Sequence, residues 1–290
     1  MFSRALLATD LSSASDAVVG YAALLRPLGC REIVLTHVLY VKHMVGLDEV
    51  LREEAASRIA AQKQALEAEG FVVSVEMPVG IPGPTIARVA LDKGCSLIII
   101  GSHGYGAART VALGGVATDV VHRSEVPVLV VRLRIAEDAG EKACRVLTAD
   151  VLGHVLYPTD FSDGAERAFL YVEKFVQSGC RRVTLLHVQD VSRITPYLEH
   201  RLEEFNAIDQ ARMDRLRERL LDLGAEDVAI EIPYGSPVKE ILVAVDRLCP
   251  SILIMGSHGR GFVADIFLGS LSHNVVRHAN VPVLLAPAIH

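Results

Sequence analysis

The sequence lacks any apolar run that approaches the roughly 18 residues needed to cross a membrane, and no positively charged, apolar leader opens it. It also lacks a basic excess, since the formal net charge is −6 and the isoelectric point is near 6.0. Without a basic field, general binding to nucleic acid is not expected. We therefore expect a soluble, cytoplasmic protein with no membrane and no nucleic-acid partner, in which any anion site is local.

Cysteine is scarce, and its pattern gives no sign of a disulfide framework. The cysteines form no CxxC pair and are odd in number, which is typical of a reducing compartment. No cluster of metal ligands is visible, and we predict no metal site. Because free cysteine packs as a small hydrophobic residue, we expect buried structural thiols. The cysteines are Cys30, Cys95, Cys144, Cys180 and Cys249.

What the sequence does contain is a long internal repeat. The segment Gly101–Gly104 reads GSHG and is followed, nine residues later, by Gly114-Gly115. The segment Gly256–Gly259 also reads GSHG and is followed, nine residues later, by Gly269-Ser270. An apolar run precedes each segment, so each pair of glycines marks the passage from a buried parallel strand into a loop and a helix.

The repeat extends over most of the chain. Arg4–Ser12 resembles His154–Ser162, and the register then shifts by five residues, which places the extra residues in the helical middle of the second repeat. Two copies of this length indicate two whole domains and not a solenoid. We predict domains at 1–132 and 153–290. The intervening 133–152 has no repeat partner and is predicted to be a linker that could carry a short helix.

Strand and helix signals alternate within each half. Such alternation requires right-handed parallel crossovers with helices on both faces of the sheet, so each half is predicted to be a doubly wound, Rossmann-like α/β domain. In the first half we expect strands at 4–9, 32–38, 71–77, 96–100 and 126–131, and helices at 13–28, 48–69, 84–92 and 116–123.

Polar residues gather where the predicted strands end, which is where open parallel sheets bind ligands. An acid and a hydroxyl follow the first strand of each repeat, behind a threonine. The serine could instead cap the next helix by accepting a hydrogen bond from a free amide. The residues are Thr9, Asp10 and Ser12 in the first repeat and Thr159, Asp160 and Ser162 in the second.

The glycine segments favour a phosphate site. Glycine at both ends of a loop lets backbone amides approach a polyanion, and the helix that begins at Gly269-Ser270 offers amide donors, a positive dipole end and a hydroxyl. The alternative is that the glycines only form tight turns. A Walker P-loop is excluded because no lysine follows the last glycine. The string 259–264 matches the dinucleotide fingerprint GxGxxA, but repeat one breaks it at Arg109, and we interpret it as a chance match.

The glycine pattern resembles that of the universal stress protein family, whose nucleotide-binding members carry G-x2-G-x9-G-[S/T] after the fourth strand. The resemblance spans both halves and implies an adenine nucleotide alpha hydrolase-like fold and an ATP site. In the family, the aspartate after the first strand lies by the ribose and adenine, and the valine after the second strand meets the adenine. The ligand-binding residues implied here are Thr159, Asp160, Val188, Gly256, His258, Gly259, Gly269, Ser270, Leu271 and Ser272, with Thr9, Asp10, Val38, Gly101, Gly104, Gly114 and Gly115 in the first repeat.

The first repeat departs from the family pattern at Gly115, where serine or threonine is expected. A hydrogen bond to a charged group contributes about 1.5–3 kcal/mol, so its loss should weaken nucleotide binding roughly ten- to a hundredfold. We therefore expect the second repeat to bind ATP more tightly, unless Arg109 or His103 on the first loop compensates.

The residues leave several functions open. A regulatory ATP-binding module, with or without Mg, agrees best with the resemblance. A slow ATP hydrolase would need a positioned water and a base, and we predict no catalytic residue, since His37 and His187 are interpreted as packing at strand ends. A ligand-free interaction scaffold suits the first repeat. The short aliphatic last strands, 126–131 and 281–286, are expected to pair with each other, and the chain could also form a homodimer.

Overall fold

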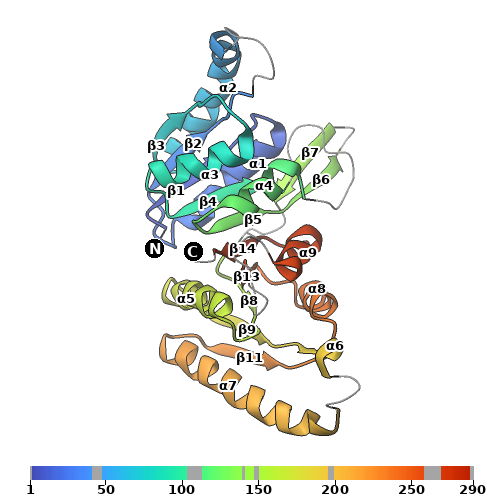
Figure 1. Ribbon diagram of the computed structural model, residues 1–290. Coiled ribbons are helices and arrows are strands. Elements are labelled where there is room, and N and C mark those ends of the chain that lie inside the picture. Colours follow the sequence, from blue (N-terminus) through green and yellow to red (C-terminus); the bar gives the residue numbers. More distant parts are fainter. Residues whose placement is uncertain are drawn as a thin grey trace. The chain divides into compact units, whose positions relative to one another are not determined.

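The computed structural model describes residues 2–40, 48–102, 113–138, 141–146, 150–194, 199–257 and 269–287. The chain divides into two compact units, Met1–Ala149 and Asp150–Ala288, and this division lies inside the predicted linker. Each unit has helices on the faces of a parallel sheet (Figure 1), which confirms the predicted tandem α/β fold.

The first unit has the strand order β3-β2-β1-β4-β5, with all neighbours parallel. Its helices lie on both faces of the sheet. Helices α1 and α2 contact each other on one face, and α3 and α4 contact each other on the other face. The strands are β1 (Arg4–Ala8), β2 (Glu32–Thr36), β3 (Val72–Glu76), β4 (Leu97–Gly101) and β5 (Val128–Val131), and the helices are α1 (Ser13–Ala22), the 3-10 turn η1 (Ala23–Leu25), α2 (Asp48–Ala68), α3 (Pro82–Asp92) and α4 (Gly115–Arg123).

The second unit repeats this order as β11-β9-β8-β13-β14, again parallel. Figure 1 shows α5 on one side of its sheet and α8 and α9 on the other. The strands are β8 (Val155–Pro158), β9 (Arg182–Leu186), β11 (Asp227–Glu231), β13 (Ile252–Gly256) and β14 (Val283–Ala286), with a short parallel pair of β10 (Gln189–Asp190) and β12 (Tyr234–Gly235). The helices are α5 (Asp163–Gln177), α6 (Val191–Ile194), the 3-10 turn η2 (Glu199–Arg201), α7 (Leu202–Asp222), α8 (Pro237–Leu248) and α9 (Ser270–His278).

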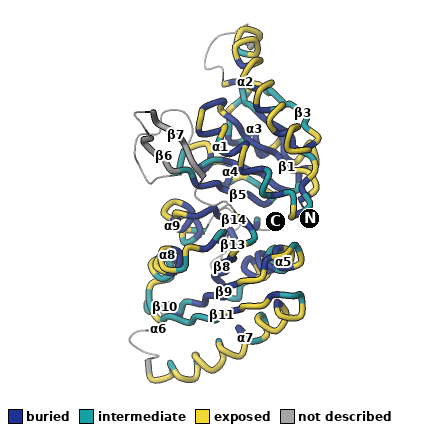
Figure 2. Tube along the Cα trace, turned by 180° about the vertical axis from the view of Figure 1, so that it is seen from behind, coloured by how far each residue is buried: buried dark blue, intermediate teal, exposed yellow. Residues whose placement is uncertain are grey.

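The core of each unit lies along its central strands. Every residue of β13 is buried, as are the first four residues of β4, while the edge strand β3 has no fully buried residue. Figure 2 shows these central strands dark blue and the outward helix faces yellow. A strand covered on both faces needs a continuous apolar run. This explains the apolar runs that precede the two glycine segments, SLIII at 96–100 and SILIM at 251–255.

The predicted linker contains a β-hairpin and not a helix. Strands β6 (Leu133–Asp138) and β7 (Glu141–Val146) pair antiparallel, and β7 lies next to α1. The alternation of apolar and charged residues from Val131 to Ile135 has the period of a strand, and that signal was overlooked in the sequence.

The extra residues of the second repeat do not lie within its long helix, because α2 and α7 are each 21 residues long. Leu66 and Leu220 accept the same hydrogen bond after these helices, from Phe71 N and Ala225 N. The numbering offset is 150 at His37 and His187 and 154 at the two leucines (220 minus 66). Most of the insertion therefore precedes α7, and helix residues of the two units correspond at an offset of 154.

Candidate functional site

Both units have a topological switch between the first and fourth strands along the chain, β1 and β4 in the first unit and β8 and β13 in the second. Ligands of open parallel sheets bind outside the carboxyl ends of the strands at such a point. The structure brings the predicted residues to this edge from distant segments. They are Thr9, Asp10 and Gly101 in the first unit and Thr159, Asp160 and Gly256 in the second.

The turn after the first strand has the same hydrogen bonds in both units. Leu11 N donates to Thr9 Oγ1 at 3.0 Å, and Ser12 N and Ser12 Oγ donate to Asp10 Oδ1 at 3.0 and 2.5 Å. In the second unit the same three bonds, within the segment 159–162, measure 3.0, 3.1 and 2.5 Å. The aspartate therefore orders the turn in both copies.

Ser12 and Ser162 are the N-cap residues of α1 and α5, the alternative role that the sequence left open for them. Each hydroxyl oxygen accepts from a helix amide, Ser15 N or Ala165 N, at 3.3 Å. The same hydroxyl donates to the aspartate, so the carboxylate is held beside the helix start, where the dipole stabilises negative charge.

The residue between the aspartate and the serine is strained in both units. Leu11 has φ 61° and Phe161 has φ 57°, the left-handed region that bulky residues rarely adopt. Such a conformation persists only where the surroundings hold it, and it is enriched at ligand sites. Nothing in the residue types Leu and Phe signalled this strain in the sequence.

The glycine segments end on matching helix starts. Gly114 and Gly269 are the N-cap residues of α4 and α9 and provide no side-chain cap. Their amides donate to Ser102 O at 2.8 Å and Ser257 O at 2.9 Å, which closes each loop at its base. The following amides have no acceptor within the helix and lie at its positive end, an arrangement suited to an anion.

Two serines begin α9, and their environments differ. Ser270 is exposed at the first helical position, whereas Ser272 is buried and donates to Gly256 O at 2.9 Å. Ser272 therefore ties α9 to the end of β13, while Ser270 faces outward and Leu271 is half-buried between them. Ligand roles for these three residues stay predictions.

At the start of α4, the first unit lacks both of the serine hydroxyls that the second unit has at the start of α9. Gly115 is exposed at the first position of α4, and a Cβ added to it would meet no atom of the described residues within 4 Å. Ala117 stands where the second unit has Ser272, so the tie to the strand end is absent there. A serine would fit at position 115 without displacing any neighbour.

Several predicted residues lie outside the described ranges. They are Gly104, His258 and Gly259, together with His103 and Arg109 on the first loop. Val38 and Val188 are described: each is half-buried, two residues beyond the end of β2 or β9.

The strand-end histidines bond the turn that carries the aspartate. Nδ1 of His37 lies 3.0 Å from Thr9 O, and Nδ1 of His187 lies 2.8 Å from Thr159 O. In the second unit, Nε2 of His187 also lies 3.3 Å from Asp209 Oδ2 on α7. Sequence reasoning missed Asp209, because it lies on a helix that only the fold brings to this edge.

The first unit anchors the same turn with a different residue. Thr9 Oγ1 donates to Gln62 Oε1 at 2.8 Å, and Gln62 Nε2 donates to Asp16 Oδ1 at 2.7 Å. Gln62 is buried on α2, and Leu216 takes its place on α7. This anchor was also missed in the sequence.

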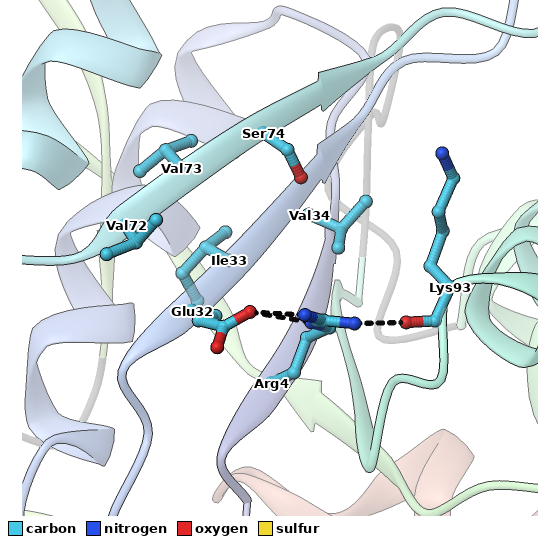
Figure 3. Close-up of a pocket in the computed structure, with 8 residues that line it drawn as sticks. All are labelled: Arg4, Glu32, Ile33, Val34, Val72, Val73, Ser74 and Lys93. Carbon is cyan, nitrogen blue, oxygen red and sulfur yellow. Dashed lines mark hydrogen bonds and ion pairs between the residues drawn. The ribbon is translucent and has the colours of Figure 1, made fainter.

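A shallow pocket lies away from this edge, along β2 and β3 of the first unit (Figure 3). Its charged side chains are already paired: Arg4 Nη2 lies 2.6 Å from Glu32 Oε2, Arg4 Nη1 donates to Lys93 O at 2.8 Å, and Lys93 pairs with Glu76. Arg4, Glu32 and Val72 begin their strands, so the pocket reaches the amino end of the sheet. We do not assign the ligand site to it.

Three of the cysteines are buried, as predicted. Burial raises the pKa of Cys30 and of Cys95 to about 11 and also raises the pKa of Cys180, which keeps these thiols protonated and unreactive. The prediction was wrong for Cys249, which is exposed, and the side chain of Cys144 lies outside the described residues.

Neither a metal cluster nor a membrane-spanning helix is found among the described residues. Among them, no group of three or more His, Cys, Asp or Glu side chains is placed to hold a metal ion. No described helix is both long enough and apolar enough to cross a membrane.

Comparison with known proteins points to one family. The model of the universal stress protein family matches residues 1–132 and 152–287. A universal stress protein of Mycolicibacterium smegmatis is 28% identical over 297 residues, which cover 97% of this chain and 95% of that protein. One of Methanocaldococcus jannaschii is 34% identical over 150 residues, which cover 45% of this chain and 92% of that protein.

A solved structure shares the fold over nearly the whole length. The crystal structure of a universal stress protein from Archaeoglobus fulgidus superposes with a TM-score of 0.70 at 26% identity and covers 98% of this chain and 96% of that one. The match extends over both units, so the tandem arrangement is shared with this neighbour.

Proposed function

This chain belongs to the universal stress protein family, and from that premise we propose that it binds an adenine nucleotide, ATP, at the carboxyl edge of its second sheet. Bound ATP, with or without Mg, acts as a regulatory ligand in a stress response. It shifts the population of a surface that a partner protein reads, which requires different affinities for the two states.

One observation carries this proposal: the start of α9. Gly269 leaves the first amides of the helix uncovered by any capping side chain, and the exposed Ser270 adds a hydroxyl donor beside them. Amide donors, a helix dipole and a hydroxyl are what a polyphosphate requires, so the residues present fit the ligand.

The turn after β8 supplies the other half of the proposed site. Asp160 is held beside α5 by its bonds from Ser162 N and Ser162 Oγ, so its carboxylate has a fixed position at the same sheet edge. We assign it to the ribose and adenine end of the nucleotide. Val188, half-buried after β9, is assigned to the adenine.

We propose regulation and not rapid hydrolysis. Phosphoryl transfer to water needs a positioned water, a base and stabilisation of developing charge. His187 uses Nδ1 to bond Thr159 O and faces Asp209 with Nε2, so its ring is part of the scaffold of the turn that carries Asp160.

Native mass spectrometry of the freshly purified chain, followed by denaturation and identification of any released small molecule, tests the function without assuming a ligand. One adenine nucleotide per chain supports the proposal with the second unit as the tight site, and two would show that Gly115 is compensated. No nucleotide, with none taken up from Mg-ATP, would favour a ligand-free scaffold. The same spectrum gives the number of chains per particle and tests the predicted homodimer.

Gly269→Asp locates the site. An aspartate is a good N-cap and the backbone there has φ −64° and ψ 145°, so folding should be preserved. Its charge would stand where the phosphates bind, and two like charges about 4 Å apart repel by roughly 4 kcal/mol at an effective dielectric of about 20. We expect ATP affinity to fall about a hundredfold or more in calorimetric titration, with an unchanged melting temperature. Unchanged affinity would remove α9 from the site.

A further inference from the structure

In the second unit, a cluster of side chains links the turn after β8 to helix α7. The Thr159 carbonyl oxygen can only accept, so His187 Nδ1 donates to it at 2.8 Å. His187 Nε2 lies 3.3 Å from Asp209 Oδ2, and Gln189 Nε2 donates to the same oxygen at 3.2 Å. The side chains of His187 and Asp209 are only 8% and 13% exposed, so these bonds are largely shielded from water.

The same cluster holds the strained residue of the turn. The ring of Phe161, whose φ is 57°, lies 4.6 Å from the ring of His187, and the guanidinium of Arg212 lies 5.1 Å from its centroid. Arg212 Nη1 is also 4.0 Å from Asp209 Oδ1. Asp209 therefore meets both groups that pack on Phe161.

The first unit keeps the histidine and the arginine of this cluster but lacks its other members. The helix position of Asp209 is held by Ala55, and Leu39 and Leu11 hold the positions of the glutamine and the phenylalanine. Arg58, which corresponds to the packing arginine, instead donates to Leu11 O at 2.6 Å. The carboxylate on the helix is thus particular to the unit for which tighter nucleotide binding is proposed.

We propose that Asp209 is a positioning residue of the second nucleotide site, acting through His187. The inference rests on the proposed function. Asp209 fixes the imidazole, the imidazole fixes the Thr159 carbonyl, and that carbonyl belongs to the peptide that leads into Asp160. We call this chain of contacts, from Asp209 through His187 to the Thr159 carbonyl, the brace. Because the carbonyl and the Asp160 amide share one plane, the brace sets the direction in which the Asp160 carboxylate enters the site.

The position of the brace predicts which part of the ligand depends on it. It supports the turn assigned to the ribose and adenine, whereas Ser270 stands at the helix assigned to the phosphates. Loss of Asp209 should therefore weaken adenosine, AMP and ATP by the same factor. Loss of the Ser270 hydroxyl should weaken ATP far more than adenosine.

The test uses the full chain with its first site blocked by Gly114→Asp, titrated calorimetrically with adenosine, AMP and ATP. For Asp209→Ala we expect all three dissociation constants to rise roughly three- to tenfold, the effect of one lost hydrogen bond. Asp209→Asn should stay within about twofold of the parent, because an amide can both accept from and donate to Nε2. Asp222→Ala removes the same carboxylate from an exposed position on α7 and should change nothing.

Each outcome of these titrations either supports or overturns the positioning role of Asp209. Unchanged binding in Asp209→Ala, a loss confined to ATP, or an Asn variant as weak as the Ala variant overturns the positioning role. If Asp209→Ala does not fold, Gln189→Leu, which introduces the first unit's residue, should weaken all three ligands equally by about twofold, and no change would count against the brace. A parent chain that binds none of the three ligands overturns the proposed function itself.

Discussion

The helices after the two glycine segments start with almost the same backbone and different side chains. Gly114 has φ −64° and ψ 151°, and Gly269 has φ −64° and ψ 145°. The next residue is Gly115 in the first unit and Ser270 in the second. The amide donors therefore come with the fold and are common to both units, whereas the hydroxyl is a separate addition that one unit has and the other lacks.

The turns after the first strands differ in the same way. Both have the threonine, aspartate and serine bonds, but in one unit the turn is anchored to α2 by Gln62 and in the other to α7 through His187 and Asp209. A turn with strained backbone needs an anchor from its surroundings, and more than one kind of side chain on the neighbouring helix can provide it.

Exchanging the two helix-start residues should give the largest effect on this comparison. We expect Gly115→Ser to tighten ATP binding in the first unit, and Ser270→Gly to weaken it in the second, each roughly ten- to a hundredfold, because one hydrogen bond to a charged group is gained or lost. The open space at Gly115 means that the new side chain needs no rearrangement.

Each exchange is measured by calorimetry in a chain whose other site is blocked by aspartate at Gly114 or Gly269. The control is Ser57→Ala on α2, because Ser57 is exposed and its loss leaves both helix starts untouched. Equal affinities in both parent units, or an exchange without effect, would show that the hydroxyl does not distinguish the two sites.

The fold could be predicted because its strongest signals are local. Strands such as β4 and β13 are buried on both faces and give continuous apolar runs, and the glycines after them mark the loops. The hairpin of β6 and β7 was not predicted, because 133–152 has no repeat partner and its charged first residues are also typical of a linker. Comparison of the repeats offers no help where only one copy exists.

The site could be predicted only in part. Asp10 and Asp160 were found because they recur directly after matching strands, and the capping serines follow from the same pattern. Gln62 and Asp209 were missed because neither has a counterpart of its own type in the other repeat, and the numbering offset changes before α7. A comparison of the two repeats can identify only residues that both copies share. Gln62 and Asp209 differ between the copies, and they are the residues that anchor the turns.

The anchor of the first unit provides a middle-sized effect. Gln62→Leu introduces the residue that the second unit has at Leu216 and removes the bonds to Thr9 Oγ1 and Asp16 Oδ1. We expect the first unit to lose about 1–2 kcal/mol of unfolding free energy, since the buried Thr9 hydroxyl loses its acceptor. Amide hydrogen exchange, followed separately in α2 and α7, measures this loss unit by unit.

Gln64→Leu is the matched control, because Gln64 is exposed on the same helix and should change stability by no more than about 0.5 kcal/mol. Protection of α2 that stays the same in Gln62→Leu would mean that the turn does not depend on this anchor. An equal loss of protection in α7 would mean that the effect is not confined to the first unit.

The smallest expected difference concerns the turns before the fourth strands. Cys249 follows α8 with φ 44°, while Gly94, at the corresponding place after α3, has φ 62°. A left-handed residue with a Cβ costs roughly 1–2 kcal/mol, and the greater freedom of glycine in the unfolded chain offsets part of the gain from relieving that strain. Cys249→Gly should therefore stabilise the second unit by about 0.5–1 kcal/mol.

Cys249→Ala separates strain from the loss of the sulfur, because it removes the contact of Cys249 Sγ with Asp246 O at 3.3 Å but keeps the Cβ. Only the glycine variant should raise the denaturant midpoint, and Gly94→Ala in the first unit should lower it by a similar amount, although no neighbour lies within 4 Å of the added Cβ. If Gly94→Ala were neutral, the backbone conformation would not be the cause, and equal stabilisation by Cys249→Ala would point to the thiol instead.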